Sequence, residues 1–417
     1  MSVVRQLRAG EPAVDLGKMI QNYRRNGPLE SEFYTNDDIF AADMQRIWGR
    51  WWLFAGHGCT IPRPGDYFTY QVGRDPILVV RGDDGEVRAF FNTCRHRGAR
   101  VCPAESGHAK RLVCPYHNWT YDLGGKLLMD SKEDYGVDRS ELSLHPIHVR
   151  DAAGLIFISL AHNPPSFDEA FATITRKLKP HGMARAKIAH TADYVVKANW
   201  KIIFENNREC MHCPPNHKEY NLSTYDVMRD QARSDPARAK QMDAIIAESN
   251  ARFRALGLDE GDASSSMTGT FFRCHRTPLR KGFVSQTLDG KPACRLPMGD
   301  FKDHDVGTLR ITIFPNFWQH SNSDYAAAAR LTPLAPGLTA VRGYWLVHED
   351  AVEGKDYTLD KLLPAWAATN EQDWTICENQ QIGVSSSRYK PGYYSLSKEG
   401  NVAHFDEWYL GEMSRAT

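Results

Sequence analysis

Two short segments, Cys94-Arg95-His96 and Cys114-Pro115-Tyr116-His117, stand on either side of a stretch of 17 residues. Each segment offers one thiolate and one imidazole. If the four side chains bind one metal centre, the chain between them must fold back so that two loop tips meet. The spacing therefore predicts a small domain with converging hairpin loops and a metal centre with two sulfur and two nitrogen ligands.

A [2Fe-2S] cluster of the Rieske type takes this ligand set, because one iron keeps two Cys sulfurs while the other takes two His nitrogens. Such ligation raises the reduction potential above that of an all-Cys ferredoxin, so the centre can accept electrons from a ferredoxin-type donor. Zinc is the alternative, since Cys2His2 is also tetrahedral. It fits less well, because each half here mixes Cys with His, whereas such zinc sites usually pair like with like.

The flanking sequence predicts a small all-β domain around these segments. A helix from Tyr34 to Trp52, capped near Asn36, precedes it, and Asn163-Pro164-Pro165 marks its end. The predicted strands are Tyr67–Gly73, Pro76–Gly82, Glu86–Asn92, Arg111–Cys114, Thr120–Leu128 and Leu155–Leu160. We therefore divide the chain into an N-terminal segment and helix (1–44), a cluster domain (45–162) and a larger second domain (163–417).

The second domain mixes both periodicities. Its predicted strands are Thr191–Ala198, Thr308–Phe314, Asp324–Thr332 and Thr339–Val347, and its predicted helices are Asn199–Glu209, Asp235–Leu256 and Asp356–Gln381, the last interrupted by Pro364. Strands that follow one another through short loops favour an antiparallel sheet, with helices packed on one face.

His212 and His217 form a second candidate metal site. On a continuous helix, five residues turn about 500°, which would leave the two rings roughly 140° apart. Pro214-Pro215 removes this objection, because prolines would end the helix just past His212 and let His217 fold back. An anionic third ligand would complete a 2-His-1-carboxylate site for Fe(II), which leaves three positions on the metal open.

The segments Cys94-Arg95-His96-Arg97-Gly98 and Cys114-Pro115-Tyr116-His117-Asn118-Trp119 resemble the cluster loops of the Rieske non-haem iron oxygenases, large (α) subunit. Respiratory-chain Rieske proteins are the alternative, but their loops carry two further cysteines, and Cys102 has no counterpart in the second loop here. The resemblance implies an α+β fold, with an all-β Rieske [2Fe-2S] domain and a helix-grip (START-like) catalytic domain built on an antiparallel sheet.

The resemblance also implies a ligand set. It assigns the cluster to Cys94, His96, Cys114 and His117, and a mononuclear Fe(II) to His212, His217 and a carboxylate on a helix near the C-terminus. Asp373 stands where the family pattern has its Asp, and burial between tryptophans would be costly for a carboxylate that bound nothing. Glu371 and Glu378 on the same helix are the competing candidates, and a solvent-facing charge is the alternative to any ligand role.

Glu209, three residues before His212, holds the position where most of the family has Asp. There the carboxylate links a cluster His of one subunit to an iron His of its neighbour, which implies a head-to-tail homotrimer. Glu209-Cys210-Met211-His212-Cys213 resembles the subset that acts on quaternary ammonium compounds such as glycine betaine, carnitine, choline and proline betaine (stachydrine), although that subset often has Tyr where Met211 stands.

The activity implied is that of the oxygenase component of a multicomponent system, which hydroxylates or oxidatively N-demethylates a small betaine and releases formaldehyde. Electrons would come from a separate flavin and iron–sulfur reductase fed by NAD(P)H, because no Gly-x-Gly-x-x-Gly follows a strand here. A quaternary ammonium is recognised by aromatic faces. The candidates, each equally a core residue, are Phe271, Phe272, Phe314, Phe317, Trp318 and Tyr344.

Two other function classes are weighed against this one. An aromatic ring-hydroxylating dioxygenase, or another Rieske monooxygenase acting on an aromatic acid, would have a pocket without a cation cage, and the dioxygenases usually have a small β subunit. A pure electron carrier would need only the cluster domain, and the further ~250 residues argue against it.

Charge and cysteine content limit the partners and the compartment. Lys plus Arg and Asp plus Glu both number 51, so no net charge favours nucleic acid or an anionic membrane. Met1 to Gln21 lacks a continuous apolar run, and we expect a cytoplasmic protein. Two of the nine cysteines are assigned to the cluster, and we expect the other seven to be buried thiols rather than disulfides.

Overall fold

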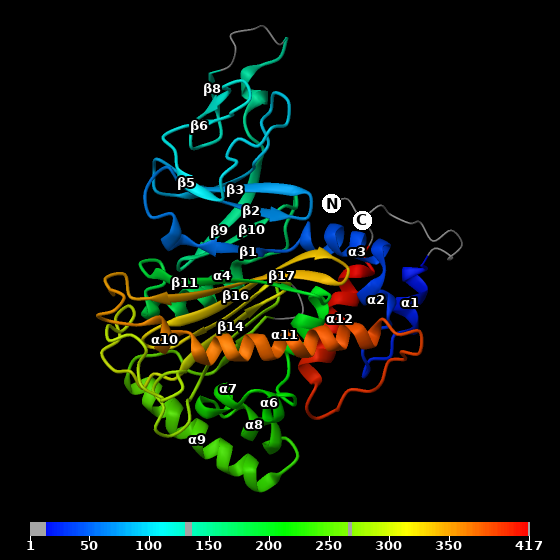
Figure 1. The fold of residues 1–417 in the computed structure, drawn as a ribbon, viewed down its shortest axis with the longest axis vertical. Helices are drawn as coiled ribbons and strands as arrows, with labels where there is room; N and C mark the ends of the chain where they lie inside the picture. Colours follow the sequence, from blue (N-terminus) through cyan, green and yellow to red (C-terminus); the bar gives the residue numbers. More distant parts are fainter. Residues whose placement is uncertain (1–13, 130–135, 266–268, 416–417) are drawn as a thin grey trace.

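Two seven-stranded antiparallel sheets, one in each domain, organise the chain (Figure 1). The structure is a computed structural model that describes residues 14–129, 136–265 and 269–415, so residues 1–13 of the predicted N-terminal segment lie outside it. The predicted fold class, an all-β domain beside a domain with an antiparallel sheet and helices, is confirmed. No helix within the described ranges is both long and apolar enough to cross a membrane.

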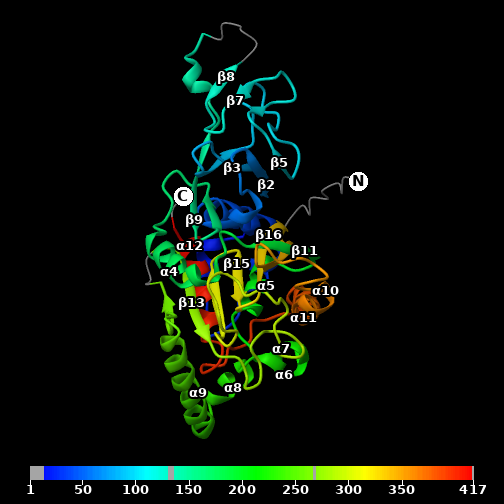
Figure 2. The ribbon, with the colours of Figure 1, turned by 90° about the vertical axis from the view of Figure 1, so that its left-hand side faces the viewer.

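The first domain is built on a sheet with the strand order β1-β10-β9-β4-β3-β2-β5. Its strands are β1 (Leu53–His57), β2 (Asp66–Val72), β3 (Asp75–Arg81), β4 (Val87–Phe91), β5 (Ser106–His108), β9 (Pro146–Ala152) and β10 (Leu155–Ser159). A three-stranded sheet, β6 (Leu112–Val113), β7 (Thr120–Tyr121) and β8 (Leu127–Met129), stands at the far end of the molecule (Figures 1 and 2). The domain therefore carries its loop tips away from the second domain.

The second domain has the strand order β11-β17-β16-β15-β14-β13-β12, so only the edge strand β11 lies out of chain order. Its strands are β11 (Lys187–Val196), β12 (Asp262–Ser264), β13 (Phe272–Thr277), β14 (Thr308–Ile313), β15 (Phe317–Ser321), β16 (Ala326–Ala335) and β17 (Leu338–Val347). Its helices are α4 (Asp168–Leu178), α5 (Trp200–Asn206), α6 (Cys213–Asn216), α7 (Lys218–Ser223), α8 (Asp226–Ala232), α9 (Pro236–Ala255), α10 (Leu359–Leu362), α11 (Pro364–Val384) and α12 (Gly400–Met413).

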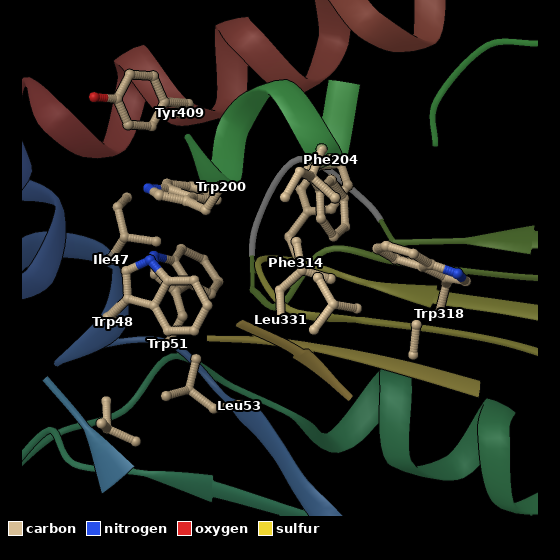
Figure 3. Close-up of a cluster of buried hydrophobic side chains, with 14 of the residues drawn as sticks. Ile47, Trp48, Trp51, Leu53, Trp200, Phe204, Phe314, Trp318, Leu331 and Tyr409 are labelled. Carbon is tan, nitrogen blue, oxygen red and sulfur yellow. The ribbon is translucent and has the colours of Figure 1, made fainter. Parts of the chain in front are cut away.

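The two faces of this second sheet bury different partners. Alternation along β15 sends Phe317 to one face, where it packs with Phe54 of β1 and Phe157 of β10, and Trp318 to the other. On the Trp318 face the core includes Phe204 of α5 and Tyr409 of α12 (Figure 3). The expectation that all helices cover one face is wrong, because α4 packs on the same face as the first sheet.

The N-terminal helices α1 (Leu16–Asn22), α2 (Glu32–Thr35) and α3 (Asp37–Asp43) pack against the second domain (Figure 1). Asp43, fully buried, accepts hydrogen bonds from Lys201 Nζ at 2.5 Å and from the Tyr409 hydroxyl at 2.6 Å. A buried charge is tolerated when an opposite charge and hydrogen bonds meet it. This ion pair therefore joins α3, α5 and α12, which lie far apart in the sequence.

Two predicted helices have different ends from those expected. The first is capped by Asn36, as expected, but continues as a π-helical turn (Met44–Trp48) and stops there, four residues before Trp52. Trp52 instead lies directly before β1, and the chain must leave the helical conformation before this strand begins at Leu53. The C-terminal helix is interrupted at Pro364, as predicted: α10 ends at Leu362, and Pro364 opens α11, where a proline is tolerated because the first helical N–H groups have no intrahelical acceptor.

Candidate metal centres and substrate cavity

The two cluster loops have the same backbone plan. In the first, which follows β4, the Cys94 N–H donates to Ala99 O and the Gly98 N–H donates to Cys94 O. In the second, between β6 and β7, the Cys114 N–H donates to Trp119 O and the Asn118 N–H donates to Cys114 O. Gly98 (φ +79°) and Asn118 (φ +59°) occupy matching left-handed positions, which glycine and asparagine tolerate best. Each loop therefore presents one Cys and one His in a tight turn.

The four predicted cluster side chains meet between these turns. The Nδ1 atoms of His96 and His117 lie 3.1 Å apart, and the thiols of Cys94 and Cys114 are buried beside each other. Burial, together with the neighbouring His96 and Arg97, lowers the pKa of His117 and so favours the neutral ring that metal binding requires. A pair of neighbouring thiols and a pair of neighbouring ring nitrogens, one of each from each turn, fit a [2Fe-2S] cluster with mixed ligands.

The mononuclear site brings together side chains from three elements. His212 caps α6, His217 lies between α6 and α7, and Asp373 lies on α11. Asp373 Oδ1 is 2.9 Å from His217 Nε2 and 3.4 Å from His212 Nε2. Two imidazole nitrogens and one carboxylate oxygen converging in this way are the donor set that Fe(II) takes in a 2-His-1-carboxylate site.

The competing carboxylates point elsewhere. Glu371 is exposed, and Glu378 accepts a hydrogen bond from the backbone N–H of Lys197 at 2.9 Å. Of the three acidic residues considered on α11, Asp373 alone faces the histidines.

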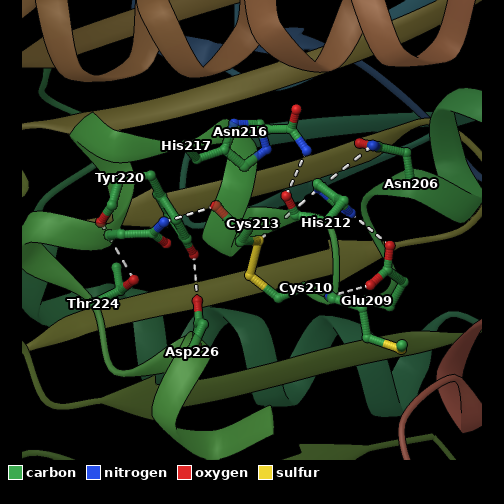
Figure 4. Close-up of a disulfide and its surroundings, with 12 residues drawn as sticks. Asn206, Glu209, Cys210, His212, Cys213, Asn216, His217, Tyr220, Thr224 and Asp226 are labelled. Carbon is green, nitrogen blue, oxygen red and sulfur yellow. Dashed lines mark hydrogen bonds and ion pairs between the residues drawn. A yellow bond between two sulfur atoms is a disulfide. The ribbon is translucent and has the colours of Figure 1, made fainter. Parts of the chain in front are cut away.

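The Nδ1 atom of each histidine contacts a side-chain oxygen. Glu209 Oε1 lies 2.5 Å from His212 Nδ1 (Figure 4), and Gln372 Oε1 lies 2.9 Å from His217 Nδ1. Gln372 in turn donates to Glu219 Oε2 at 2.9 Å. These contacts turn both Nε2 atoms toward Asp373, as partners of metal-bound imidazoles commonly do. Sequence reasoning missed Gln372 and Glu219, whose one signal was that Gln372 adjoins Asp373.

The charges of this site depend on one another. Burial lowers the pKa of His212, but hydrogen bonds to Asp373 and Glu209 outweigh it and raise the pKa to about 9. Burial raises the pKa of Asp373, and the two histidines outweigh it and lower the pKa. A metal ion would take the place of the shared protons, because ligand imidazoles and carboxylates bind metal in their deprotonated forms.

The backbone reaches this geometry by a route that differs from the predicted one. Helix α5 ends at Asn206, well before His212, and not at Glu209. Pro214 and Pro215 do not end a helix but open the one-turn helix α6, whose first turn accepts proline. His217 then follows α6 and lies close to His212, as expected. The predicted cause, a helix ended by the prolines, is wrong.

A disulfide joins Cys210 to Cys213, with the Cα atoms 4.9 Å apart, on either side of His212 (Figure 4). This contradicts the expectation that all seven remaining cysteines are free thiols, since the turn into α6 brings these two sulfurs together. The other five are free, as expected; they are Cys59, Cys102, Cys274, Cys294 and Cys377.

A cavity of about 220 Å³ opens beside the mononuclear site. Tyr220, Trp318 and Trp366 line it, and the Tyr220 and Trp366 rings lie 5.7 Å apart. Of the six predicted aromatic candidates, Trp318 lines this cavity and the other five pack in the hydrophobic core.

Two of those core rings, Phe271 and Phe314, do face a cation, which is the side chain of Arg208. The Arg208 guanidinium lies 5.6 Å from the Phe271 ring centroid and 5.3 Å from that of Phe314. Phe271 and Phe314 are therefore already in contact with a cation of the chain. A molecule bound beside the metal site would contact the aromatic wall formed by Tyr220, Trp318 and Trp366.

Two family models together match most of the chain. Residues 51–134 match the family described as the Rieske [2Fe-2S] domain, and residues 183–415 match the ring hydroxylating alpha subunit (catalytic domain).

Individual relatives extend this match. The glycine betaine monooxygenase oxygenase subunit of Pseudomonas aeruginosa (strain UCBPP-PA14) is 40% identical over 99% of this chain and 96% of its own length. The carnitine monooxygenase oxygenase subunit of Acinetobacter pittii (strain PHEA-2) is 33% identical over 43% of this chain and 51% of its own. The fold is shared with the quaternary ammonium Rieske monooxygenase CntA in complex with L-carnitine, with a TM-score of 0.67 at 21% identity, covering 95% of this chain and 98% of that one.

Proposed function

This chain belongs to the family of Rieske oxygenase α subunits, and we propose that it oxidises a small quaternary ammonium compound of the betaine type. Membership, together with the full-length match to a monooxygenase oxygenase subunit, makes it an iron-dependent monooxygenase with a Rieske [2Fe-2S] cluster and a mononuclear iron. The observation that carries the proposed substrate is the aromatic wall of Tyr220, Trp318 and Trp366 beside the iron ligands. A quaternary ammonium binds to ring faces, and no salt bridge is needed.

We assign the metals to the residues that the structure brings together. Cys94, His96, Cys114 and His117 would hold the cluster, and His212, His217 and Asp373 would hold the iron. When bound, the iron activates dioxygen and the cluster supplies a stored electron. Gln372 and Glu209 keep the ligand rings oriented, and the aromatic wall would hold an N-methyl group close to the three residues that would bind the iron.

The proposed reaction inserts one oxygen atom of O2 into a C–H bond of an N-methyl group, while two electrons and two protons convert the other atom to water. The resulting hemiaminal releases formaldehyde, and the C–N bond breaks to leave the demethylated amine. An NAD(P)H-fed flavin and iron–sulfur reductase would supply the electrons, which places the proposed system in the cytoplasm. Hydroxylation without loss of the carbon is the other outcome of the same insertion.

A homotrimer is part of the proposal. The loops of the cluster domain lie at one end of the molecule, whereas α6 and α7 lie on the far side of the second domain (Figures 1 and 2). An electron would therefore pass from the cluster of one subunit to the iron of its neighbour. Glu209 already contacts one iron ligand and is the side chain that we expect to meet a cluster histidine of the partner subunit.

A single-turnover experiment tests the substrate class without the reductase. Protein with both metals loaded is reduced with dithionite, freed of reductant and mixed with oxygen and glycine betaine, carnitine, proline betaine or benzoate. We expect formaldehyde and accelerated cluster reoxidation with at least one betaine. Product from benzoate alone would replace this proposal with the aromatic-acid alternative, and the His212→Ala variant serves as the control without iron.

A further inference from the structure

One wall of the cavity is rich in cations, and the sheet register explains how they gather there. On β13, β14 and β15, cross-strand pairing makes two adjacent rows on the cavity face: His275, Arg310 and His320 in one, and Arg273, Thr312 and Trp318 in the other. Directly paired side chains have Cβ atoms about 4.5–5.5 Å apart. The basic row therefore lies next to the aromatic residue that we assign to the ammonium group.

The charges along this wall do not balance. Arg310 donates to Asp226 at 2.7 Å, and Arg273 donates to Asp262 at 2.5 Å, so each of these guanidiniums has its own carboxylate. Arg229 of α8 also lines the cavity, and throughout the described part of the chain its guanidinium has neither a hydrogen bond nor an ion pair. Burial and the neighbouring Arg310 lower the pKa of Arg229. Three guanidiniums thus share two carboxylates.

His275 supplies a second, independent sign that a group is missing. Its Nδ1 atom is buried and has no hydrogen-bond partner among the residues that the structure describes, which is unusual for a buried polar atom. Burial and then Arg273 and Arg310 lower the pKa of His275 well below its usual value, so the ring is neutral and carries one N–H. An acceptor that brings negative charge would satisfy this ring and Arg229 together.

We propose that Arg229 and His275 bind the carboxylate of the substrate and so select zwitterions over simple quaternary ammonium cations. This inference rests on the proposed function. A guanidinium can hold a carboxylate through two parallel hydrogen bonds, and a betaine separates its two charges by only a few atoms. With the carboxylate on Arg229, the quaternary nitrogen reaches the neighbouring aromatic wall. A cation without a carboxylate meets the same excess positive charge and is repelled.

Equilibrium binding of glycine betaine and choline to the oxidised, metal-loaded protein tests this. Choline keeps the trimethylammonium group and replaces the carboxylate by an alcohol. We expect the wild type to prefer betaine, and Arg229→Gln to weaken betaine binding by about 10- to 100-fold while choline binding is unchanged or tighter. Arg229→Lys, which keeps the charge but not the paired donors, should fall between the two.

Arg233→Gln is the matched control, because Arg233 also lines the cavity but already donates to the carbonyl oxygens of Ser397 and Lys398. Its betaine-to-choline preference should equal that of the wild type. If the wild type binds no quaternary ammonium compound, the proposed function fails. If it binds betaine no better than choline, or if Arg229→Gln keeps the full preference, the carboxylate assignment alone is overturned. Cluster absorbance reports folding, and His275→Asn provides a second test should Arg229→Gln not fold.

Discussion

The proposed cluster loops and the proposed iron site would each hold a metal through a few side chains, but they are built in opposite ways. The four cluster side chains lie between residues 94 and 117, in two turns with one backbone plan. The iron side chains span residues 212 to 373 and depend on contacts between α6, α7 and α11. A local site keeps its geometry when distant parts change, whereas a site assembled from distant segments fails with any of them. The first two predictions below change one site and measure the other.

The largest effect is expected for Asp373→Ala. The variant should lose the mononuclear iron and all turnover, because two histidines alone bind Fe(II) weakly. Iron should fall from about three to about two atoms per chain, with the cluster spectrum unchanged. Glu371→Ala, an exposed change on the same helix, should retain both iron and activity. Retention of iron in Asp373→Ala would remove this residue as a ligand.

The converse change is His117→Cys in the cluster loop. A thiolate places more negative charge on its iron than an imidazole does, so the reduction potential should fall by on the order of 100 mV or more. Electrochemistry of the variant measures this shift, and metal analysis should still find the mononuclear iron. An unchanged potential would contradict the assignment of His117, and loss of mononuclear iron would contradict the independence of the two sites.

Glu209→Gln tests the link between the sites. It removes the charge from a side chain that contacts His212 but keeps an acceptor of the same length. Both metals should load, while reoxidation of the reduced cluster with substrate and oxygen should slow by about 10- to 100-fold. Stopped-flow absorbance follows this rate. Full speed in Glu209→Asp would show that side-chain length is unimportant. Glu219→Gln, which changes a hydrogen bond of Gln372, the residue that contacts the other histidine, should slow reoxidation much less.

The smallest effect is a pH dependence confined to the second domain. Glu205 of α5 lies against Asp406 of α12, and burial raises the pKa of Glu205 to about 7. The folded state then binds more protons than the unfolded state between about pH 4.5 and 7, so stability should fall as pH rises through this window, by on the order of 1–3 kcal/mol. Thermal unfolding at pH 5.5 and 8 measures this difference. Glu205→Gln should flatten the dependence, and an equal dependence in that variant would exclude Glu205 as its source.

The same contrast explains what the sequence could predict. Spacing alone predicts that Cys94, His96, Cys114 and His117 share a centre, because their geometry is set within each turn. Gln372 and Glu219 could not be found, because their roles exist only after α11 has packed against α7. Five of the six aromatic candidates for the cavity were wrong for a related reason. Both faces of β14 and β15 are buried, so alternation separates Phe317 from Trp318 but does not say which one meets the cavity.

The buried contact of Asp43 with Lys201 and Tyr409 has a consequence for the order in which the chain can fold during synthesis. Asp43 leaves the ribosome long before Tyr409, and everything that forms the first domain is made between it and Lys201. The first domain can therefore fold while α3 still waits for α5 and α12. During that interval Trp48 lacks one of its packing partners, the ring of Trp200 on α5, until that helix has been made.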